Sequence, residues 1–314
     1  YVSGRACDHY NRFREDFGIA KELGHTAHRF SLEWSRIEPE KGRFNEDAIQ
    51  HYREVLAALR ERGLEPFVTL WHFTLPKWFA RMGGFENNES PFYFARYCAY
   101  AASQLKDLAT FWQTENEPTV YWGQSYFKGH WPPQRTFYFR NVTANLIKGH
   151  IAAYRKIKDF APELKIGIAK NNVDFGSAKW SIAGHIVKFF RHRIQNRYFL
   201  DAIANYQDFI GLNFYFHQHY GLTFDAERSD MGWPIFPESL YRVLMLLKKY
   251  DKPVYITENG VADARDSLRA NYIKNHLRWT HKAIEDGPWM SAATSIGRFW
   301  TILSGTRVSG RVLA

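Results

Sequence analysis

The sequence predicts an α/β fold, specifically a (β/α)8 TIM barrel, from two observations. Short apolar runs alternate with longer amphipathic segments, and polar residues stand where several of the apolar runs end. Near-continuous apolar strands separated by helices indicate a parallel sheet that is covered on both faces. Polar residues at the carboxyl ends of strands favour a barrel, whose functional residues lie at that rim. A doubly wound sheet is the alternative, but no glycine-rich phosphate loop follows any predicted strand.

Six strand–helix units are expected, each justified by its own pattern. The helix over 46–62 has apolar residues at Ile49, Tyr52, Val55, Leu56 and Leu59, and a glycine follows it. The run 65–73 is almost continuously apolar, as expected of a buried strand. The predicted strands are 26–34, 65–73, 109–115, 165–170, 208–215 and 253–258, and the predicted helices are 16–23, 46–62, 92–105, 143–160, 237–250 and 269–286.

Length and composition favour a single large domain over 1–287, followed by a tail at 288–314. The chain has 314 residues, of which 45% are hydrophobic, enough for a substantial core. No apolar run approaches the roughly 18 residues that a membrane span requires, so no membrane partner is expected. Cys7 and Cys98 give neither a disulfide framework nor a zinc spacing, and a cytoplasmic location is the default.

The net charge of +10 is not expected to indicate nucleic-acid binding. That interpretation requires basic residues clustered on one face, whereas acidic residues interrupt most basic segments here. The stretch 188–197 is the exception, because it contains no acidic residue. The 11 Trp and 18 Tyr are more informative, since aromatic rings stack on the apolar faces of sugars, although many simply fill cores.

Two glutamates end two of the predicted strands. Glu117 lies in the string TENEP at 114–118, and Glu258 lies in ITENG at 256–260. Pro118 stops the first strand, and Asn259-Gly260 provides a tight turn after the second. Two carboxyl groups brought to one rim are what glycosidic bond cleavage requires, one as proton donor and the other as nucleophile or base.

The chain resembles the family 1 glycoside hydrolases, the retaining β-glucosidase and β-galactosidase group. Beside the two glutamate motifs, the matching strings are HRFSLEWSRI at 28–37, WHFTLP at 71–76, GLNFY at 211–215 and MGW at 231–233. Together these strings are highly specific, and the similarity extends from the start of the sequence to Gly287.

The resemblance implies a role for each catalytic candidate. Glu258 is expected to attack the anomeric carbon, and Glu117 to protonate the leaving oxygen and then deprotonate water. The charge of Glu258 should raise the pKa of Glu117 until Glu258 is esterified. Arg29 would keep Glu258 ionised, and the hydroxyl of Tyr215 would orient it.

Four more residues are expected to hold the substrate. Asn116 would bind the sugar 2-OH, and His72 the 3-OH unless it is a structural histidine bonded to backbone. Asn213 would support the same pocket. Trp233 would stack on the aglycone, with packing in the core as the alternative. Phe73 occupies a position where many family members have Trp. The mechanism needs no metal and no cofactor, and no metal-ligand cluster is evident.

Both ends differ from the family pattern. The sequence opens in the region that precedes the second family strand, so a barrel without strands one and eight is expected. After Gly287 it reads PWMSAATSIGRFWTILSGTRVSGRVLA. A back-translation of this tail, shifted in frame, reads VDVRGYFHWSLLDNFEWDTGFRPRFG, which is the expected family ending. We therefore interpret the tail as a frameshifted eighth strand. Circular permutation explains only residues 291–295.

The expected function is hydrolysis of terminal β-glucosides, with tolerance of galactosides or fucosides, by a retaining mechanism. β-Glucosides or short β-linked oligosaccharides are the expected partners. Two alternatives are a truncated homologue that only binds glycosides and an endo-acting glycanase on a similar barrel. Unpaired, apolar strand edges would also allow the chain to form a homo-oligomer.

Overall fold

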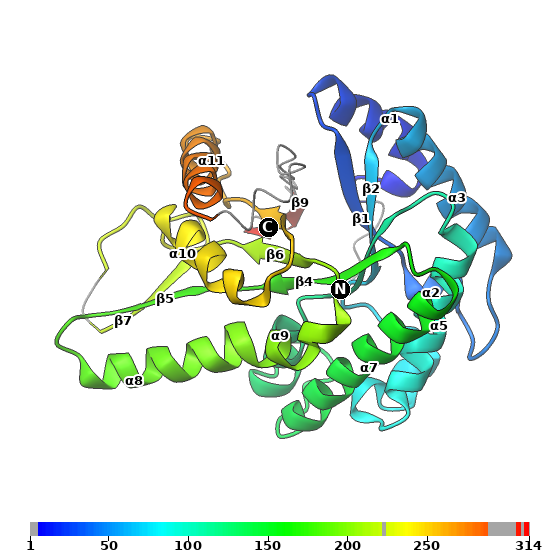
Figure 1. The fold of residues 1–314 in the computed structure, drawn as a ribbon, viewed down its shortest axis with the longest axis horizontal. Helices are drawn as coiled ribbons and strands as arrows, with labels where there is room; N and C mark the ends of the chain where they lie inside the picture. The colour runs from blue at the N-terminus through cyan, green and yellow to red at the C-terminus, as the bar shows by residue number, and fades with distance from the viewer. Residues whose placement is uncertain (1–5, 222–223, 288–305, 309–310, 314) are drawn as a thin grey trace. The chain divides into compact units, whose positions relative to one another are not determined.

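The computed structural model describes residues 6–221, 224–287, 306–308 and 311–313. Its helices and strands alternate along the chain (Figure 1). In order they are α1 His9–Glu22, β1 Ala27–Ser31, α2 Trp34–Ile37, α3 Glu46–Glu61, β2 Glu65–Trp71, α4 Lys77–Arg81, η1 Gly84–Glu86, α5 Ser90–Leu105, β3 Phe111–Asn116, α6 Pro118–Trp122, η2 Gly123–Phe127, α7 Phe139–Phe160, β4 Lys165–Asn171, β5 Asp174–Ser177, α8 Ile182–Arg191, η3 His192–Arg197, α9 Tyr198–Ile203, η4 Ala204–Tyr206, β6 Ile210–Phe214, β7 His217–Tyr220, α10 Glu238–Leu247, η5 Lys248–Tyr250, β8 Val254–Asn259, α11 Arg269–Glu285, β9 Thr306–Val308 and β10 Arg311–Leu313.

Six strands form one sheet in the order β1-β2-β3-β4-β6-β8. The pairs of β1 with β2, β2 with β3 and β3 with β4 are parallel, as the alternation of strands and helices predicts. All six predicted strands are present, so the expectation of an incomplete (β/α)8 barrel is confirmed within the described residues. Most of the predicted tail lies outside these residues, and β9 and β10 form a separate antiparallel pair.

The chain divides into two compact units. Unit 1 comprises Tyr1–Asp8, Asn171–Asp201 and Leu212–Ala314, and unit 2 comprises His9–Lys170 and Ala202–Gly211. The chain passes between them inside β4 and β6, so each unit contains part of the sheet. Glu117 belongs to unit 2 and Glu258 to unit 1.

Unit 2 contains β1, β2, β3 and most of β4 with the helices that cover them. Its helix α1 packs on α3 through Phe13, Phe17, Val55 and Leu59, which are nearly inaccessible to solvent. Helix α3 begins at an Asn45 cap, whose side chain accepts from two backbone N–H groups, and it buries the apolar face predicted from the sequence. Burial of these side chains fixes the helix layer against the strands.

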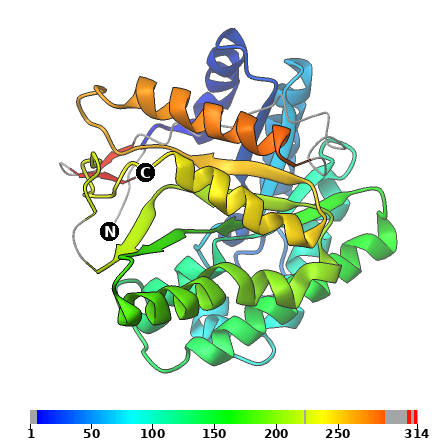
Figure 2. The ribbon, with the colours of Figure 1, turned by 60° about the vertical axis from the view of Figure 1, so that its left-hand side comes forward.

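Unit 1 contains the end of β6, β8, and a second small sheet. In that sheet β5 pairs in parallel with β7, an extension that the sequence analysis did not predict. Helices α10 and α11 lie side by side (Figure 2). A buried network joins the small sheet to α10: Ser239 donates to Asp174 at 2.7 Å, and the Nδ1 atom of His217 lies 2.8 Å from the same carboxylate. This network fixes the position of β7, which follows directly after Tyr215.

Within the described residues, no helix combines the length and apolar character needed to cross a bilayer.

Candidate active site

The carboxyl ends of β1 and β3 in unit 2 are connected by a buried arginine. Arg29, which is 6% exposed, donates from Nε to the hydroxyl of Thr69 at 3.0 Å and from its guanidinium to the Oδ1 atom of Asn116 at 2.7 Å. It also donates to Gln113. The partners of Arg29 lie on two neighbouring strands, β2 and β3, so the guanidinium is fixed in position before any substrate binds.

Asn116 in turn connects this arginine to His72. Its Nδ2 atom lies 3.1 Å from Nε2 of His72, at the end of β2. Because the Oδ1 atom accepts from Arg29, the amide presents its N–H group to the ring, which then accepts at Nε2. Arg29, Asn116 and His72 therefore form one polar row along three strand ends.

Glu117 lies next to this row in a conformation that glutamate seldom adopts. Its backbone has φ 45° and ψ 55°, in the left-handed region. Pro118 begins α6 immediately afterwards, and the N–H group of Glu117 donates to the carbonyl of Ala169 at 2.7 Å. The residue is 8% exposed. A strained position maintained by a proline and a strand contact is typical of functional residues.

A buried lysine lies on the neighbouring strand. Lys170, at the end of β4, is inaccessible to solvent and donates from Nζ to the hydroxyl of Thr119 at 3.0 Å. Burial lowers the pKa of Lys170 to about 7, and the nearby charge of Glu117 acts in the opposite direction. The sequence analysis did not single out Lys170, because a strand-end lysine normally reaches solvent.

Glu115, two residues before Glu117, occupies a different environment. The pairing of β3 with β4 shifts register between Gln113 and Asn116, which changes the face on which the following side chains lie. Glu115 is fully buried, and neither of its oxygens has a hydrogen-bond partner among the described residues. Burial raises the pKa of Glu115 well above its usual value, so this carboxyl group stays protonated.

The end of β8 in unit 1 presents Glu258. The hydroxyl of Tyr215 donates to its Oε2 atom at 2.6 Å, and Glu258 is 9% exposed. A short hydrogen bond to the charged form orients the carboxylate and favours ionisation. The pairing of Tyr215 with Glu258 is the one implied by the resemblance.

Residues that flank Glu258 hold the strand end in place. Thr257 donates to the Oδ1 atom of Asn213 at 2.6 Å, so Asn213 supports the strand through a side-chain bond. Asn259 donates to the carbonyl of Phe214 at 2.7 Å and to the hydroxyl of Tyr272 at 2.9 Å. The sequence analysis missed Tyr272, since nothing in the pattern of α11 distinguishes it from a core residue.

Trp233 lies near the same group of residues. Its ring centroid is 6.0 Å from that of Tyr215 and 4.8 Å from that of Phe216. The side chain is only partly buried, and the backbone N–H group of Trp233 donates to Ser229 at 3.2 Å. A half-exposed indole beside Tyr215 is compatible with stacking on a ligand.

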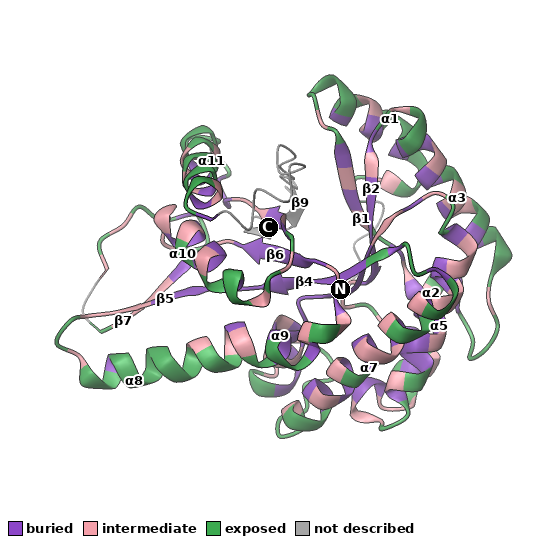
Figure 3. Cartoon of the chain, in the orientation of Figure 1, coloured by how far each residue is buried: buried purple, intermediate pink, exposed green. Residues whose placement is uncertain are grey.

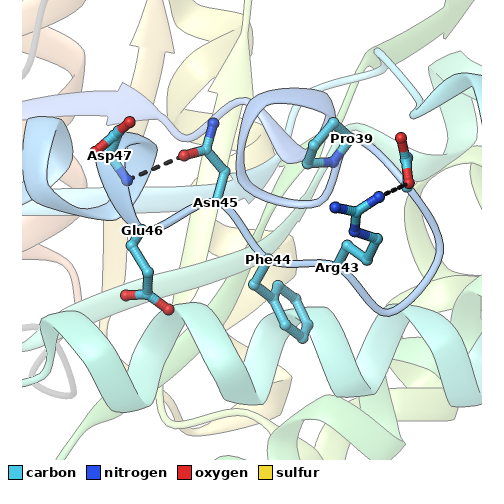
Figure 4. Close-up of a pocket in the computed structure, with 7 residues that line it drawn as sticks. Pro39, Arg43, Phe44, Asn45, Glu46 and Asp47 are labelled. Atoms are coloured by element: carbon cyan, nitrogen blue, oxygen red, sulfur yellow. Dashed lines mark hydrogen bonds and ion pairs between the residues drawn. The ribbon is translucent and has the colours of Figure 1, made fainter.

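A surface hollow in unit 2 lies apart from these residues. It has a volume of about 340 Å³ and is lined by the segment 39–47 (Figure 4). Asn45 in this segment accepts from the N–H group of Asp47 at 3.0 Å, and Arg43 pairs with Glu40 at 2.6 Å. These polar side chains cap a helix and pair with each other. None of the predicted site residues lines the hollow. Among the described residues, no group of three or more His, Cys, Asp or Glu could hold a metal ion.

Comparison with known proteins identifies the family. The model of glycosyl hydrolase family 1 matches residues 2–209 and 216–296. The chain belongs to glycosyl hydrolase family 1. The match confirms the resemblance seen in the sequence, and it means that the chain is a glycoside hydrolase. The alternative of a truncated homologue that only binds glycosides is not favoured.

Individual relatives and solved structures agree with the assignment of this chain to family 1. Beta-glucosidase A of Thermotoga maritima is 34% identical over 339 residues, covering 90% of this chain and 75% of the relative. The beta-glycosidase from Pyrococcus horikoshii superimposes with a TM-score of 0.85 at 36% identity, covering 91% of this chain and 74% of that one. The Thermotoga maritima beta-glucosidase in complex with deoxynojirimycin gives a TM-score of 0.83 at 31% identity, covering 90% of this chain and 76% of that one.

Within this family 1 chain, the structure groups the predicted site residues into two sets. Unit 2 brings together Arg29, His72, Asn116 and Glu117, and unit 1 brings together Asn213, Tyr215, Trp233 and Glu258. Each set contains one carboxyl group and the hydrogen-bonding residues that support its strand end.

Proposed function

We propose that this chain hydrolyses terminal non-reducing β-D-glucosyl residues, and accepts galactosyl or fucosyl residues, by a double displacement. Glu258 is the nucleophile and Glu117 the general acid and base. The observation that carries the assignment is the 2.6 Å hydrogen bond from Tyr215 to Glu258, which orients the carboxylate at the end of its strand. Beta-glucosidases and a beta-galactosidase among the relatives support this range of sugars.

In the first step Glu258 attacks the anomeric carbon while Glu117 donates a proton to the departing oxygen. The bond to the aglycone breaks as the ester bond to Glu258 forms. Retention of configuration requires the two carboxyl groups roughly 5–5.5 Å apart across the scissile bond. Arg29 provides a fixed positive charge that favours the ionised state of the nucleophile.

In the second step the negative charge of Glu258 has been lost to the ester. Glu117, now a carboxylate, removes a proton from water, which attacks the anomeric carbon and releases the sugar. Pro118 and the bond to Ala169 anchor Glu117 through its backbone. These two anchors do not change when its carboxyl group gains or loses a proton.

Asn116 and His72 bind hydroxyls of the sugar, with Asn116 directed at the 2-OH. Hydrogen bonds at that hydroxyl strengthen in the transition state and therefore accelerate the reaction. The orientation of Asn116 by Arg29 supports this role, because an amide fixed at one oxygen has a defined donor direction. Trp233 stacks on the aglycone. The reaction needs neither a metal nor a cofactor.

We also propose that the chain acts in the cytoplasm and forms homo-oligomers through the edges of its sheet. Strands β1 and β8 stand at the two ends of the sheet order among the described residues. Strand edges with available N–H and C=O groups pair readily with another copy. Two cysteines without disulfide spacing fit a reducing compartment.

The test is hydrolysis of p-nitrophenyl β-glucoside by the purified chain, by Glu258→Gln, and by a matched control, Glu115→Gln. Glu115 is a strand-end glutamate that stays protonated in burial, so glutamine imitates it closely. We expect hydrolysis by the wild type and the control, and loss in Glu258→Gln. A folded wild type without activity would contradict the function, and an active Glu258→Gln would contradict the assignment.

A further inference from the structure

Helix α8 of unit 1 presents its apolar face to solvent. Figure 3 shows that nearly the whole helix is exposed, and within Ile182–Arg191 only Gly184 is buried. Phe189 is 60% exposed and Phe190 55%, and Trp180 just before the helix is 93% exposed. In a surface helix of a globular protein the apolar stripe normally faces the core. In α8 the apolar stripe faces solvent instead.

The side of α8 that faces the protein is identified by two contacts. A Cβ atom at Gly184 would approach the side chains of Ser181 and Ser177 within 3.3 Å, so the helix backbone lies close to the end of β5 at this point. Seven residues later, the guanidinium of Arg191 lies 5.7 Å from the ring centroid of Phe175 on β5. Residues seven apart share one helix face.

The opposite side of the helix is apolar. Ile182, Ile186, Phe189 and Phe190 are spaced three or four residues apart or adjacent, and all are exposed. Ile194, one turn beyond, continues the stripe and is exposed too. Trp180 stands at its start. We call this set, Trp180, Ile182, Ile186, Phe189, Phe190 and Ile194, the α8 apolar face. An exposed apolar stripe of this size marks an interaction surface.

Positive charge surrounds this face. Between Asp174 and Asp201 the sequence contains five Lys and Arg residues and no Asp or Glu. Lys179, Lys188 and Arg193 are among them. Long basic side chains can extend along apolar surface while their charged ends remain in a polar layer. Apolar and aromatic residues on one side and basic residues around them are typical of helices that lie in a membrane interface.

We propose that α8 binds the surface of an anionic lipid bilayer, with the α8 apolar face inserted at the headgroup level. The charge distribution selects this partner. A second copy of the chain would place its own Lys179, Lys188 and Arg193 opposite the same residues of the first copy, and the like charges would repel. An anionic bilayer provides both an apolar layer and negative charge.

The proposal for this surface does not depend on the proposed function. It is also compatible with the finding that no described helix could span a membrane. The sequence prediction of no membrane partner rested on the absence of a long apolar run, which excludes a span but not a helix in the interface plane. Peripheral attachment would bring the enzyme to glycosides whose aglycone is itself a lipid.

The test is co-sedimentation of the full chain with vesicles of phosphatidylcholine containing one third phosphatidylglycerol, and with vesicles of phosphatidylcholine alone. We expect binding to the anionic vesicles that weakens as salt is raised. Phe189→Ser with Phe190→Ser should abolish binding. Each of Lys188→Gln and Arg193→Gln should weaken it about five-fold at low salt.

The matched control is Phe137→Ser, since Phe137 is 90% exposed but lies outside α8. It should bind as the wild type does. All substituted side chains are exposed, and circular dichroism confirms that each variant is folded. Absence of binding by the wild type would overturn the proposal, as would undiminished binding by the double Phe variant. A dimer on size exclusion that becomes monomeric in the double Phe variant would assign the face to a second copy instead.

Discussion

Glu117 and Glu258 both stand at the end of a strand, but the protein positions them in different ways. Glu117 is fixed through its backbone, by a left-handed conformation, the proline after it and the bond from its N–H group to Ala169. Glu258 lies at the end of a regular strand, and its carboxylate is oriented by the hydroxyl of Tyr215.

The difference matches what each role requires. A nucleophile must be ionised and aimed, and a hydrogen bond donated to the carboxylate achieves both. An acid that becomes a base must remain in place in both protonation states, and anchors that do not involve the carboxyl group allow this. Glu115 provides a third case, because its carboxyl group is buried without hydrogen-bond partners among the described residues, and burial raises its pKa well above the usual value.

The largest effect is expected for Glu258→Gln. Without a nucleophile the covalent path is closed, so kcat/KM for aryl β-glucosides should fall by at least about 10⁴-fold. In Glu258→Ala, added azide should partly restore turnover by attacking from the vacated side. Steady-state kinetics with and without azide measure both effects. A loss of less than ten-fold in kcat/KM would contradict the assignment of Glu258, and not Glu117, as the nucleophile.

Glu117→Gln should have a smaller effect that depends on the leaving group. General acid catalysis typically contributes about 10²–10⁴-fold, and a glucoside of an unactivated alcohol should lose that much. A dinitrophenyl glucoside, whose leaving group needs no proton, should form the covalent intermediate at nearly the normal rate. Pre-steady-state bursts with the two substrates provide the comparison, and equal losses for both would contradict the role of acid.

Tyr215→Phe should lower activity moderately. It removes one hydrogen bond to a charged group, worth about 1.5–3 kcal/mol, which corresponds to roughly 10–100-fold in kcat/KM. The ring and its contact with Trp233 remain, so the change isolates the hydroxyl. Tyr241→Phe, at an exposed tyrosine of α10 that bonds to Asp286, serves as control. If both variants retained wild-type rates, the carboxylate of Glu258 would be oriented by something else.

The smallest effect, on stability rather than rate, is expected for Lys170→Met. The pKa of Lys170 is lowered in the folded chain from 10.5 to about 7, so between these values the unfolded chain binds more protons. Wild-type stability therefore rises with pH across this window relative to the variant, and the cost of the buried charge is complete below pH 7. Lys170→Met should be more stable at pH 6, by on the order of 1 kcal/mol.

Urea unfolding of the two chains at pH 6, 8 and 10 measures this difference. The difference in unfolding free energy should shrink as the pH rises, because the lysine of the folded wild type loses its proton above pH 7 and no longer carries a buried charge. A difference that is constant with pH would show that Lys170 is not the titrating group.

Much of the fold could be predicted from the sequence, because most strands of the main sheet are buried runs rich in apolar residues. The helix over 46–62 begins at Glu46 as expected, since Asn45 caps it. The strands β5 and β7 were not predicted, since HQHY and DFGS have no strand-like apolar pattern and their pairing depends on distant segments. Helix α8 was not predicted either, although its apolar residues recur at helical spacing, and a sequence pattern cannot tell which side of a helix faces solvent.

The site was predictable where motifs coincide with strand ends, and less so elsewhere. Arg29, Asn116 and His72 do form one row of hydrogen bonds, and Tyr215 does contact Glu258. Lys170 could not be foreseen, because its burial depends on how α6 covers β4. Tyr272, on a helix that follows β8 in sequence, accepts a hydrogen bond from Asn259 next to Glu258, a relation visible only in three dimensions.

The central claim is that Glu258, and not Glu117, becomes covalently attached to the sugar. In 2-deoxy-2-fluoro-β-glucosyl fluoride, the fluorine at C2 slows both steps, while the fluoride at C1 is a reactive leaving group. On incubation with this compound the glycosyl-enzyme therefore accumulates. Peptide mass spectrometry then locates the label. We expect it on the peptide that contains Glu258, and lost in Glu258→Gln. A label on Glu117, or an active enzyme that is never labelled, would contradict the account.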